Sequence, residues 1–259
     1  MIARAHAKAV AYLVGLLVWL APCLCLEASE LVHRRFEVWD WSPRWRLLLS
    51  ETPILMPPDW LRQISVPPPP GEEMTRQELL ALLQLVPERP EKLERIRSQQ
   101  HNIIEIFSRF LGFPVENIVS LHRLIHHVAF DSVLAAMHFK ERYSRARPWN
   151  YLPGLAPIVD KPGHPAYPSG HATQSRALAL ALARIFPACR WRLDILAVEV
   201  AHNREIGGVH YRSDSDAGRA LGEAVFAVIA SVPRYRRLAR RVAWDVKDVR
   251  LQVARRCYN

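Results

Sequence analysis

The chain has 259 residues, of which 50% are hydrophobic and 23% are charged. This composition excludes a disordered, highly charged chain and is sufficient for one sizeable hydrophobic core. The formal net charge of +10 at pH 7 favours anionic partners, such as phosphate esters, nucleic acid or a membrane surface, without choosing among them.

The N-terminal segment has the pattern of a secretory signal. Arg4 and Lys8 form a basic start, residues 9–26 carry no charge, and Ala28 and Ser29 are small enough for a cleavage site. The uncharged stretch is also near the minimum of about 17 residues for a membrane span, so an uncleaved anchor is the alternative. We expect residues 1–28 to be a signal peptide or N-terminal anchor, and the protein to be periplasmic or secreted.

Residues 29–71 have the composition of an irregular arm. Prolines at 53, 57 and 58 and the run from Pro67 to Gly71 disfavour regular structure. Four tryptophans in this stretch indicate that the arm packs onto the rest of the chain: Trp39, Trp41, Trp45 and Trp60.

From residue 72 onward the apolar pattern predicts successive helices. Thr75 and Glu78 have the spacing of a capping box ahead of the apolar residues 79–83. Apolar residues recur with helical period over 91–111, where Gly112 and Pro114 follow, and again over 115–140. The later expected elements are a loop rich in proline and glycine over 148–170 and helices over 172–186, 191–206 and 214–230.

The predicted fold is all-α, a helical bundle formed by residues 72–259, because no segment alternates with the period of a strand. Cys189 and Cys257 follow the signal segment and would pair in an oxidising compartment if the fold brings them together. The arginine-rich stretch from Arg234 to Arg256 is interpreted as a solvated helix face rather than as a binding patch.

Three clusters carry residues suited to phosphate chemistry: Lys140, Arg147 and Pro148; Pro168, Ser169, Gly170 and His171; and Arg204, His210 and Asp214. Lysine and arginine side chains bind phosphate oxygens, and arginine does so through two parallel N–H donors. Lys140 and Arg147 would share a helix face, although Pro148 places Arg147 at or beyond the helix end. Gly170 precedes a predicted helix whose first amides would point at an anion. Together these groups predict a cradle for a tetrahedral oxyanion.

The two histidines of these clusters have complementary roles. A neutral imidazole attacks phosphorus, and a carboxylate behind it fixes its tautomer, which suits His210 with Asp214. His171 is then available to protonate the leaving alcohol. The ordinary histidine pKa near ~6.5 makes both roles accessible around neutral or mildly acidic pH.

The order and spacing of the clusters resemble the signature of the type-2 phosphatidic acid phosphatase/vanadium haloperoxidase superfamily, most closely its class A bacterial acid phosphatases. The first motif, lysine-x6-arginine-proline, and the Pro-Ser-Gly-His motif are both complete. The third motif departs once, since Asn203 stands where serine is usual before the arginine. The resemblance implies a helical bundle, a phosphohistidine intermediate and a phosphatase without a metal ion or cofactor.

Two alternatives remain open. Phosphate and vanadate are both tetrahedral oxyanions, so the motifs equally fit a vanadate-dependent haloperoxidase that oxidises halide with peroxide. His164 lies where the related bromoperoxidases have an extra histidine, whereas its ordinary interpretation is a polar loop residue. The second alternative is a non-catalytic protein that binds phosphate or an anionic surface. In the leading interpretation the partner is a phosphate-ester substrate, with no nucleic acid and with membrane contact at most through the N-terminal segment.

Overall fold

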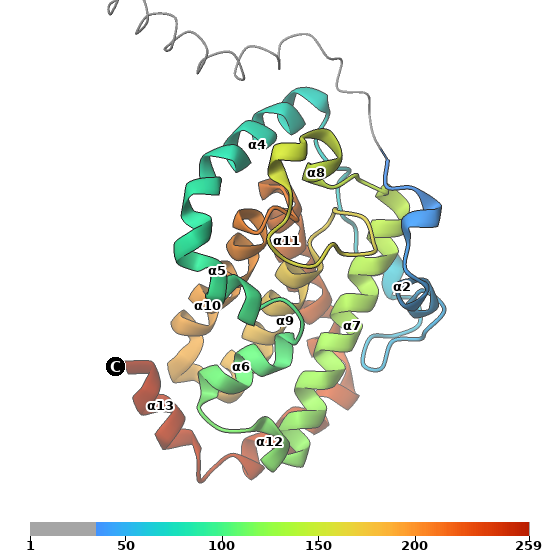
Figure 1. Ribbon diagram of the computed structural model, residues 1–259. Coiled ribbons are helices and arrows are strands. Elements are labelled where there is room, and N and C mark those ends of the chain that lie inside the picture. Colours follow the sequence, from blue (N-terminus) through green and yellow to red (C-terminus); the bar gives the residue numbers. More distant parts are fainter. Residues whose placement is uncertain (1–34, 259) are drawn as a thin grey trace, which may run out of the picture. The chain divides into compact units, whose positions relative to one another are not determined.

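A computed structural model describes residues 35–258, which form helices and contain no strand (Figure 1). The predicted all-α fold is therefore confirmed. The expected signal or anchor over residues 1–28 lies outside the described residues. Within residues 35–258, no helix is both long enough and apolar enough to cross a membrane.

The elements of the first part of the described chain are, in order, η1 (Val38–Asp40), α2 (Pro43–Leu48), α3 (Trp60–Gln63), α4 (Glu72–Leu85), η2 (Val86–Glu88), α5 (Arg89–Ser98), α6 (Ile103–Leu111), η3 (Val115–Asn117) and α7 (Val119–Tyr143). They are followed by α8 (Pro148–Tyr151), η4 (Pro153–Leu155), α9 (Gly170–Ile185), η5 (Pro187–Cys189), α10 (Arg190–Ile206), α11 (Arg212–Ser231), α12 (Pro233–Asp245) and α13 (Arg250–Tyr258).

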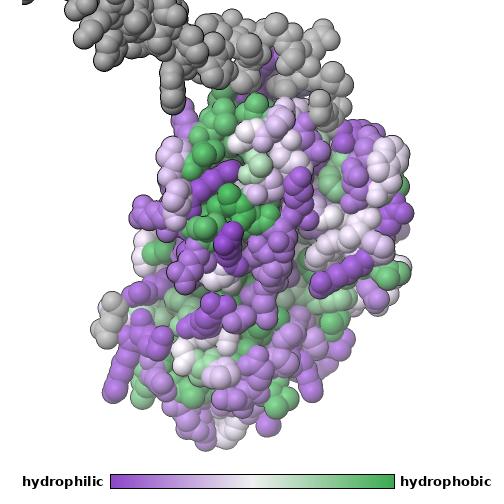
Figure 2. All heavy atoms as spheres, in the orientation of Figure 1, coloured by the Kyte–Doolittle hydropathy of each residue, from purple (hydrophilic) through white to green (hydrophobic). Residues whose placement is uncertain are grey.

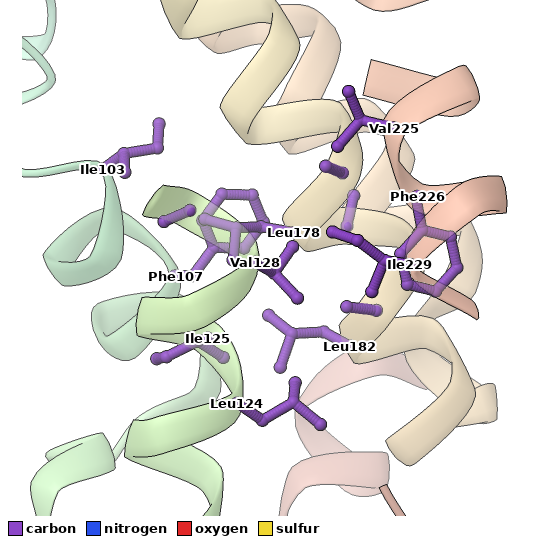
Figure 3. Packing of buried hydrophobic residues seen from close by; sticks show 14 of the residues in the cluster. Ile103, Phe107, Leu124, Ile125, Val128, Leu178, Leu182, Val225, Phe226 and Ile229 are labelled. Carbon is purple, nitrogen blue, oxygen red and sulfur yellow. The ribbon is translucent and has the colours of Figure 1, made fainter. Parts of the chain in front are cut away.

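Helix α9 is the centre of the bundle and packs against α7, α10 and α11. Figure 3 shows Leu178 and Leu182 of α9 between apolar side chains of α7 and α11. Glycines let α11 approach closely, because a Cβ at Gly218 would lie 2.4 Å from the Ser169 carbonyl oxygen, and one at Gly222 would lie 2.5 Å from that of Thr173. This packing holds the N-terminal ends of α9 and α11 side by side, and the motif histidines lie there.

The described part of the N-terminal arm, residues 35–71, packs onto the bundle, as its tryptophans indicate. Trp41 and Trp60 are buried, whereas Trp39 is 78% exposed. The backbone N–H groups of residues 54, 55 and 56 donate to the Asp131 carboxylate on α7 at 2.7, 2.8 and 2.7 Å. The arm is largely irregular, although it includes the short helices α2 and α3.

Two local predictions were wrong. Thr75 and Glu78 do not form a capping box, because α4 begins earlier, after Gly71, and both side chains instead bind Arg145. The single helix expected over 91–111 is broken, because the side chain of Asn102 caps a new helix by accepting the N–H groups of residues 104 and 105. The break leaves the carbonyl of Gln100 outside any helix, where it meets His171.

The C-terminal end is held by a disulfide between Cys189 and Cys257, so the pairing that the sequence left open is formed. Helices α12 and α13 follow α11, and the arginines of α12 are exposed, as expected for a solvated face. Hydrophilic side chains dominate the visible face of the molecule, with hydrophobic residues exposed in patches between them (Figure 2).

Candidate active site

His210 and Asp214 form a hydrogen-bonded pair at the N-terminal end of α11. The Nδ1 atom of His210 lies 2.9 Å from Oδ2 of Asp214, and that oxygen also accepts the backbone N–H of Tyr211 at 3.1 Å. Asp214 is completely buried, and it lies in the first turn of the helix, where the helix dipole favours a carboxylate. A carboxylate only accepts, so Nδ1 carries the proton and Nε2 carries the ring's lone pair.

Arg145 anchors the second oxygen of Asp214, and the sequence analysis did not identify it. Its Nη1 donates to Oδ1 of Asp214 at 2.7 Å, and its Nη2 donates to Glu78 at 2.9 Å and to Thr75 at 3.1 Å. The guanidinium also lies 3.9 Å from the ring centroid of Tyr211. Although burial lowers the pKa of Arg145, the carboxylates of Asp214 and Glu78 raise it overall. The only sequence signal was its place between Lys140 and Arg147.

The imidazole of His210 is held neutral by its surroundings. Burial, and then the positive charges of Arg147, Lys140 and Arg204, lower the pKa of His210 well below its ordinary value. Its Nε2 lies 3.2 Å from Nη1 of Arg147. An unprotonated nitrogen therefore lies directly beside a cation, which is the arrangement required for attack on an anionic phosphate.

Three buried cations act on His210, each from a different segment. Lys140, near the end of α7, donates to the carbonyls of Pro165 and Ala166 at 2.7 Å each. Arg147 is not on that helix, as a shared face would require, but caps α8 and donates to the carbonyl of His164 at 3.0 and 3.2 Å. Burial lowers the pKa of Arg147 to about 9. Burial, and then the charge of Arg147, also lower the pKa of Lys140 well below its ordinary value.

Arg204 is the cation whose hydrogen bonds are incomplete. It lies near the C-terminal end of α10 and is 2% exposed. Its Nε and Nη1 atoms have no hydrogen-bond partner among the described residues. Burial lowers its pKa to about 10. Leaving buried N–H donors of a cation unpaired costs free energy, and an oxyanion at this position would satisfy them.

Ser169 and Gly170 form the start of α9. The Ser169 hydroxyl accepts the N–H of Ala172 at 3.4 Å. The backbone N–H of Ser169 donates to the carbonyl of Asp214 at 2.9 Å. A Cβ placed on Gly170 would meet no protein atom closer than 3.9 Å, so packing does not require glycine there. A small residue at a helix N-terminus instead leaves room for an anion at the first amides.

His171 and His164 are two further histidines beside the cations. Nε2 of His171 is 3.1 Å from the carbonyl oxygen of Gln100, and burial, together with the charge of Arg204, lowers its pKa to about 3. Nδ1 of His164 is 3.0 Å from Nη2 of Arg147. His164 is thus a buried neighbour of the cradle rather than an ordinary polar loop residue.

The structure brings together the side chains that the sequence analysis selected. Residues of α4 and of the segment after α5 form hydrogen bonds to them or to their neighbours. Asn203, the departure from the third motif, donates to Oε1 of Gln99 at 2.7 Å and so joins α10 to the end of α5 beside Arg204. In the described part of the chain, no group of three or more His, Cys, Asp or Glu side chains has an arrangement that could hold a metal ion.

Comparisons with known proteins identify relatives of the region that holds these residues. Residues 121–238 match the PAP2 superfamily. The chain is 30% identical over 156 residues to a non-specific acid phosphatase of Salmonella typhi, covering 57% of this chain and 62% of the relative. It is 38% identical over 114 residues to a decaprenylphosphoryl-5-phosphoribose phosphatase of Mycobacterium tuberculosis, covering 44% of this chain and 62% of that relative.

Similarity extends to the haloperoxidases. A vanadium-dependent bromoperoxidase of Ascophyllum nodosum is 32% identical over 104 residues, covering 29% of this chain and 19% of that protein. The solved structure of a bacterial vanadium-dependent iodoperoxidase has a TM-score of 0.48 at 18% identity, covering 65% of this chain and 52% of the other. The chain thus spans less than two thirds of the length of each of these relatives.

Proposed function

Because the chain contains a PAP2 superfamily domain, we propose that it hydrolyses phosphate monoesters through a phosphohistidine on His210, without a metal ion or cofactor. The observation that carries the proposal is the neutral His210, paired with Asp214, beside Arg204, whose buried N–H groups lack partners. These are a nucleophile and an oxyanion site within one buried cluster. The proposed location is the periplasm or the exterior, or the membrane surface if residues 1–28 remain as an anchor.

The reaction proceeds in two displacements at phosphorus. In the first, Nε2 of His210 forms a bond to phosphorus while the bond to the leaving oxygen breaks, and His171 gives that oxygen a proton. In the second, His171 removes a proton from water, the water oxygen bonds to phosphorus, and the phosphorus–nitrogen bond breaks. Asp214 keeps the Nδ1 proton of His210 in place throughout and stabilises the charge that develops on the ring.

Positive charge does the work that a metal ion does in other phosphatases. Arg204 offers unpaired N–H donors, while Arg147 and Lys140 contribute charge in a buried site where electrostatic attraction is strong. The amides at the start of α9 add oriented dipoles. The phosphoryl oxygens would thus be neutralised without a cation from solution.

The low pKa of His171 disfavours its role as proton donor only while the site holds no anion. Burial and Arg204 disfavour the protonated ring, with a pKa of about 3. A bound phosphate ester brings negative charge beside the ring, and an anion raises the pKa of a neighbouring imidazole. We therefore expect His171 to take up its proton when the substrate binds, which favours turnover at mildly acidic pH.

The test is phosphoenzyme trapping with the His210→Ala variant. The parent, mixed with radiolabelled aryl phosphate and quenched in base, should retain label on histidine that acid releases, and the variant should retain none. His122→Ala, at a half-buried histidine of α7 outside the cradle, is the control and should behave as the parent does. Turnover by His210→Ala close to that of the parent would refute the nucleophile, and loss of turnover in chelator with recovery in zinc or magnesium would refute the metal-free mechanism.

Vanadate-dependent halide oxidation is the second candidate, because His164 is buried against Arg147 and a bromoperoxidase is among the relatives. The residues of the cradle fit vanadate as well as phosphate, and Lys140, Arg147 and Arg204 would hold it. Bound vanadate would supply the site that activates peroxide. The phosphatase proposal expects vanadate to inhibit hydrolysis competitively and His164→Ala to change turnover only slightly. Efficient bromide oxidation with vanadate and peroxide would identify the protein as a haloperoxidase instead of a phosphatase. Binding of phosphate without either reaction would indicate a binding protein.

A further inference from the structure

A large apolar groove lies beside the candidate active site and has no role in the chemistry described above. It is bordered by α2, the start of α6 and α7, and it is open to solvent. Half-buried apolar side chains line it: Trp45, Leu48, Ile104, Phe130 and Val133. Resting on the proposed function, we propose that this groove binds the alcohol part of the substrate, and that this alcohol is an apolar alkyl or aryl group.

The face of α7 that lines the groove continues, along the helix, toward the phosphate cradle. Phe130, Val133, Met137 and Lys140 are spaced by three and four residues, so they follow one another along one face of the helix. From Val133 to Lys140 the helix advances roughly 10 Å, at about 1.5 Å per residue. A Cβ on Gly170 would lie 3.9 Å from the Cε atoms of both Met137 and Lys140. The apolar face thus ends against the residues that would hold phosphate.

The proposed proton donor lies about one turn of α9 from a residue that lines the groove. His171 and Gln174 are three residues apart on α9, and Gln174 lines the groove and donates to the carbonyl of Ala129 on its floor at 3.1 Å. The carbonyl of Gln100, which Nε2 of His171 contacts, is followed directly by the lining residue His101. A leaving oxygen beside His171 would therefore be attached to a group that enters the groove.

A second contact joins the groove to the cradle from α2. The ring of Trp45 meets the ring of His164 edge to face at 5.1 Å between centroids, and His164 contacts Arg147. Charged and polar groups stand at the exposed rim, including Arg44, Glu51 and His101. An apolar interior with a polar rim matches an apolar ligand whose charged phosphate lies at one end, whereas a sugar would leave its hydroxyls unpaired against the floor.

The experiment measures hydrolysis of unbranched alkyl phosphates of increasing length. Burial of each added methylene should raise kcat/KM about two- to fourfold until the groove is filled. Phe130→Ser and Ile104→Ser should flatten this dependence while leaving hydrolysis of methyl phosphate unchanged. These side chains are half-buried and come from different helices, so misfolding of one variant leaves the other usable. Val119→Ser, on α7 outside the groove with its side chain 68% exposed, is the matched control.

Calorimetric binding of alkylphosphonates, which resist hydrolysis, separates this inference from the proposed function. Affinity that rises with chain length and loses that dependence in Phe130→Ser supports the groove even if no ester is hydrolysed, and in that case the phosphatase proposal alone fails. Hydrolysis or binding that is indifferent to chain length overturns the inference while leaving the phosphatase intact. Self-association of the parent that Phe130→Ser and Ile104→Ser abolish would assign the groove to a second copy of the chain and also overturn it.

Discussion

Arg145 supplies the sharpest test of how the active site is held together. Its guanidinium is buried, with 6% of the side chain exposed, and it bridges the carboxylates of Asp214 and Glu78 at 2.7 and 2.9 Å. The change Arg145→Met keeps much of the side-chain volume but leaves two carboxylates without their cation. We expect both the free energy of unfolding and the rate of turnover to fall.

The magnitude follows from burial. Removing one partner of a buried ion pair typically costs about 3–5 kcal/mol, because the remaining charge stays desolvated. Since Asp214 is 0% exposed and Glu78 is 8% exposed, neither carboxylate reaches water without a rearrangement. Asp214 would also lose the anchor that orients His210. By analogy with the outer partners of metal-bound histidines, this loss should lower kcat about 10–100-fold, with a smaller change in KM.

The assay combines urea unfolding with steady-state hydrolysis of an aryl phosphate. Arg142→Met is the matched control, since Arg142 lies near the same end of α7 but is exposed and contacts only the ring of Tyr143 in the contacts that the structure shows. Adding Glu78→Gln to Arg145→Met should recover part of the stability, because one uncompensated charge is removed. The reasoning is refuted if Arg145→Met is as stable and as active as Arg142→Met.

Three further predictions follow from the buried charges and the disulfide. Arg204→Met should lower turnover about 10²–10³-fold, because the donors for the phosphoryl oxygens are lost. The variant should nevertheless unfold no more easily than the parent, because the change removes a buried cation with unpaired N–H groups. Clear destabilisation in urea would contradict this. The folded-state pKa of His171, about 3, lies below the ordinary value near ~6.5, so the unfolded chain takes up that proton first as the pH falls. Stability should thus be lost below about pH 6.5, by up to about 2 kcal/mol from this residue at pH 5, and His171→Gln should weaken the dependence. The Cys189–Cys257 disulfide closes a separation of 68 residues, so Cys189→Ala with Cys257→Ala should lower stability by about 4 kcal/mol, whereas an unchanged melting temperature would exclude the bridge from the folded protein in solution.

Local pattern and motif spacing were enough to predict the helical class and the approximate positions of the main helices, and they selected side chains that the fold places together. Helical periodicity is visible in the sequence because burying one face of a helix requires apolar residues every three or four positions. The order and types of the motif residues also led to the proposal for which groups attack, orient and bind. None of these inferences needed a contact between distant parts of the chain.

Contacts across the fold were decided only by the tertiary structure. The spacing of Thr75 and Glu78 in the sequence is that of a helix cap. In the folded protein α4 packs beside Asp214, and both side chains instead accept hydrogen bonds from the buried Arg145. The role of the break between α5 and α6 is likewise visible only in the folded protein, where the carbonyl of Gln100 contacts His171. Sequence determined which helices and which chemical groups exist, because those depend on neighbours in the chain. Only packing determined which charges are desolvated together, because burial depends on residues that lie far apart in sequence.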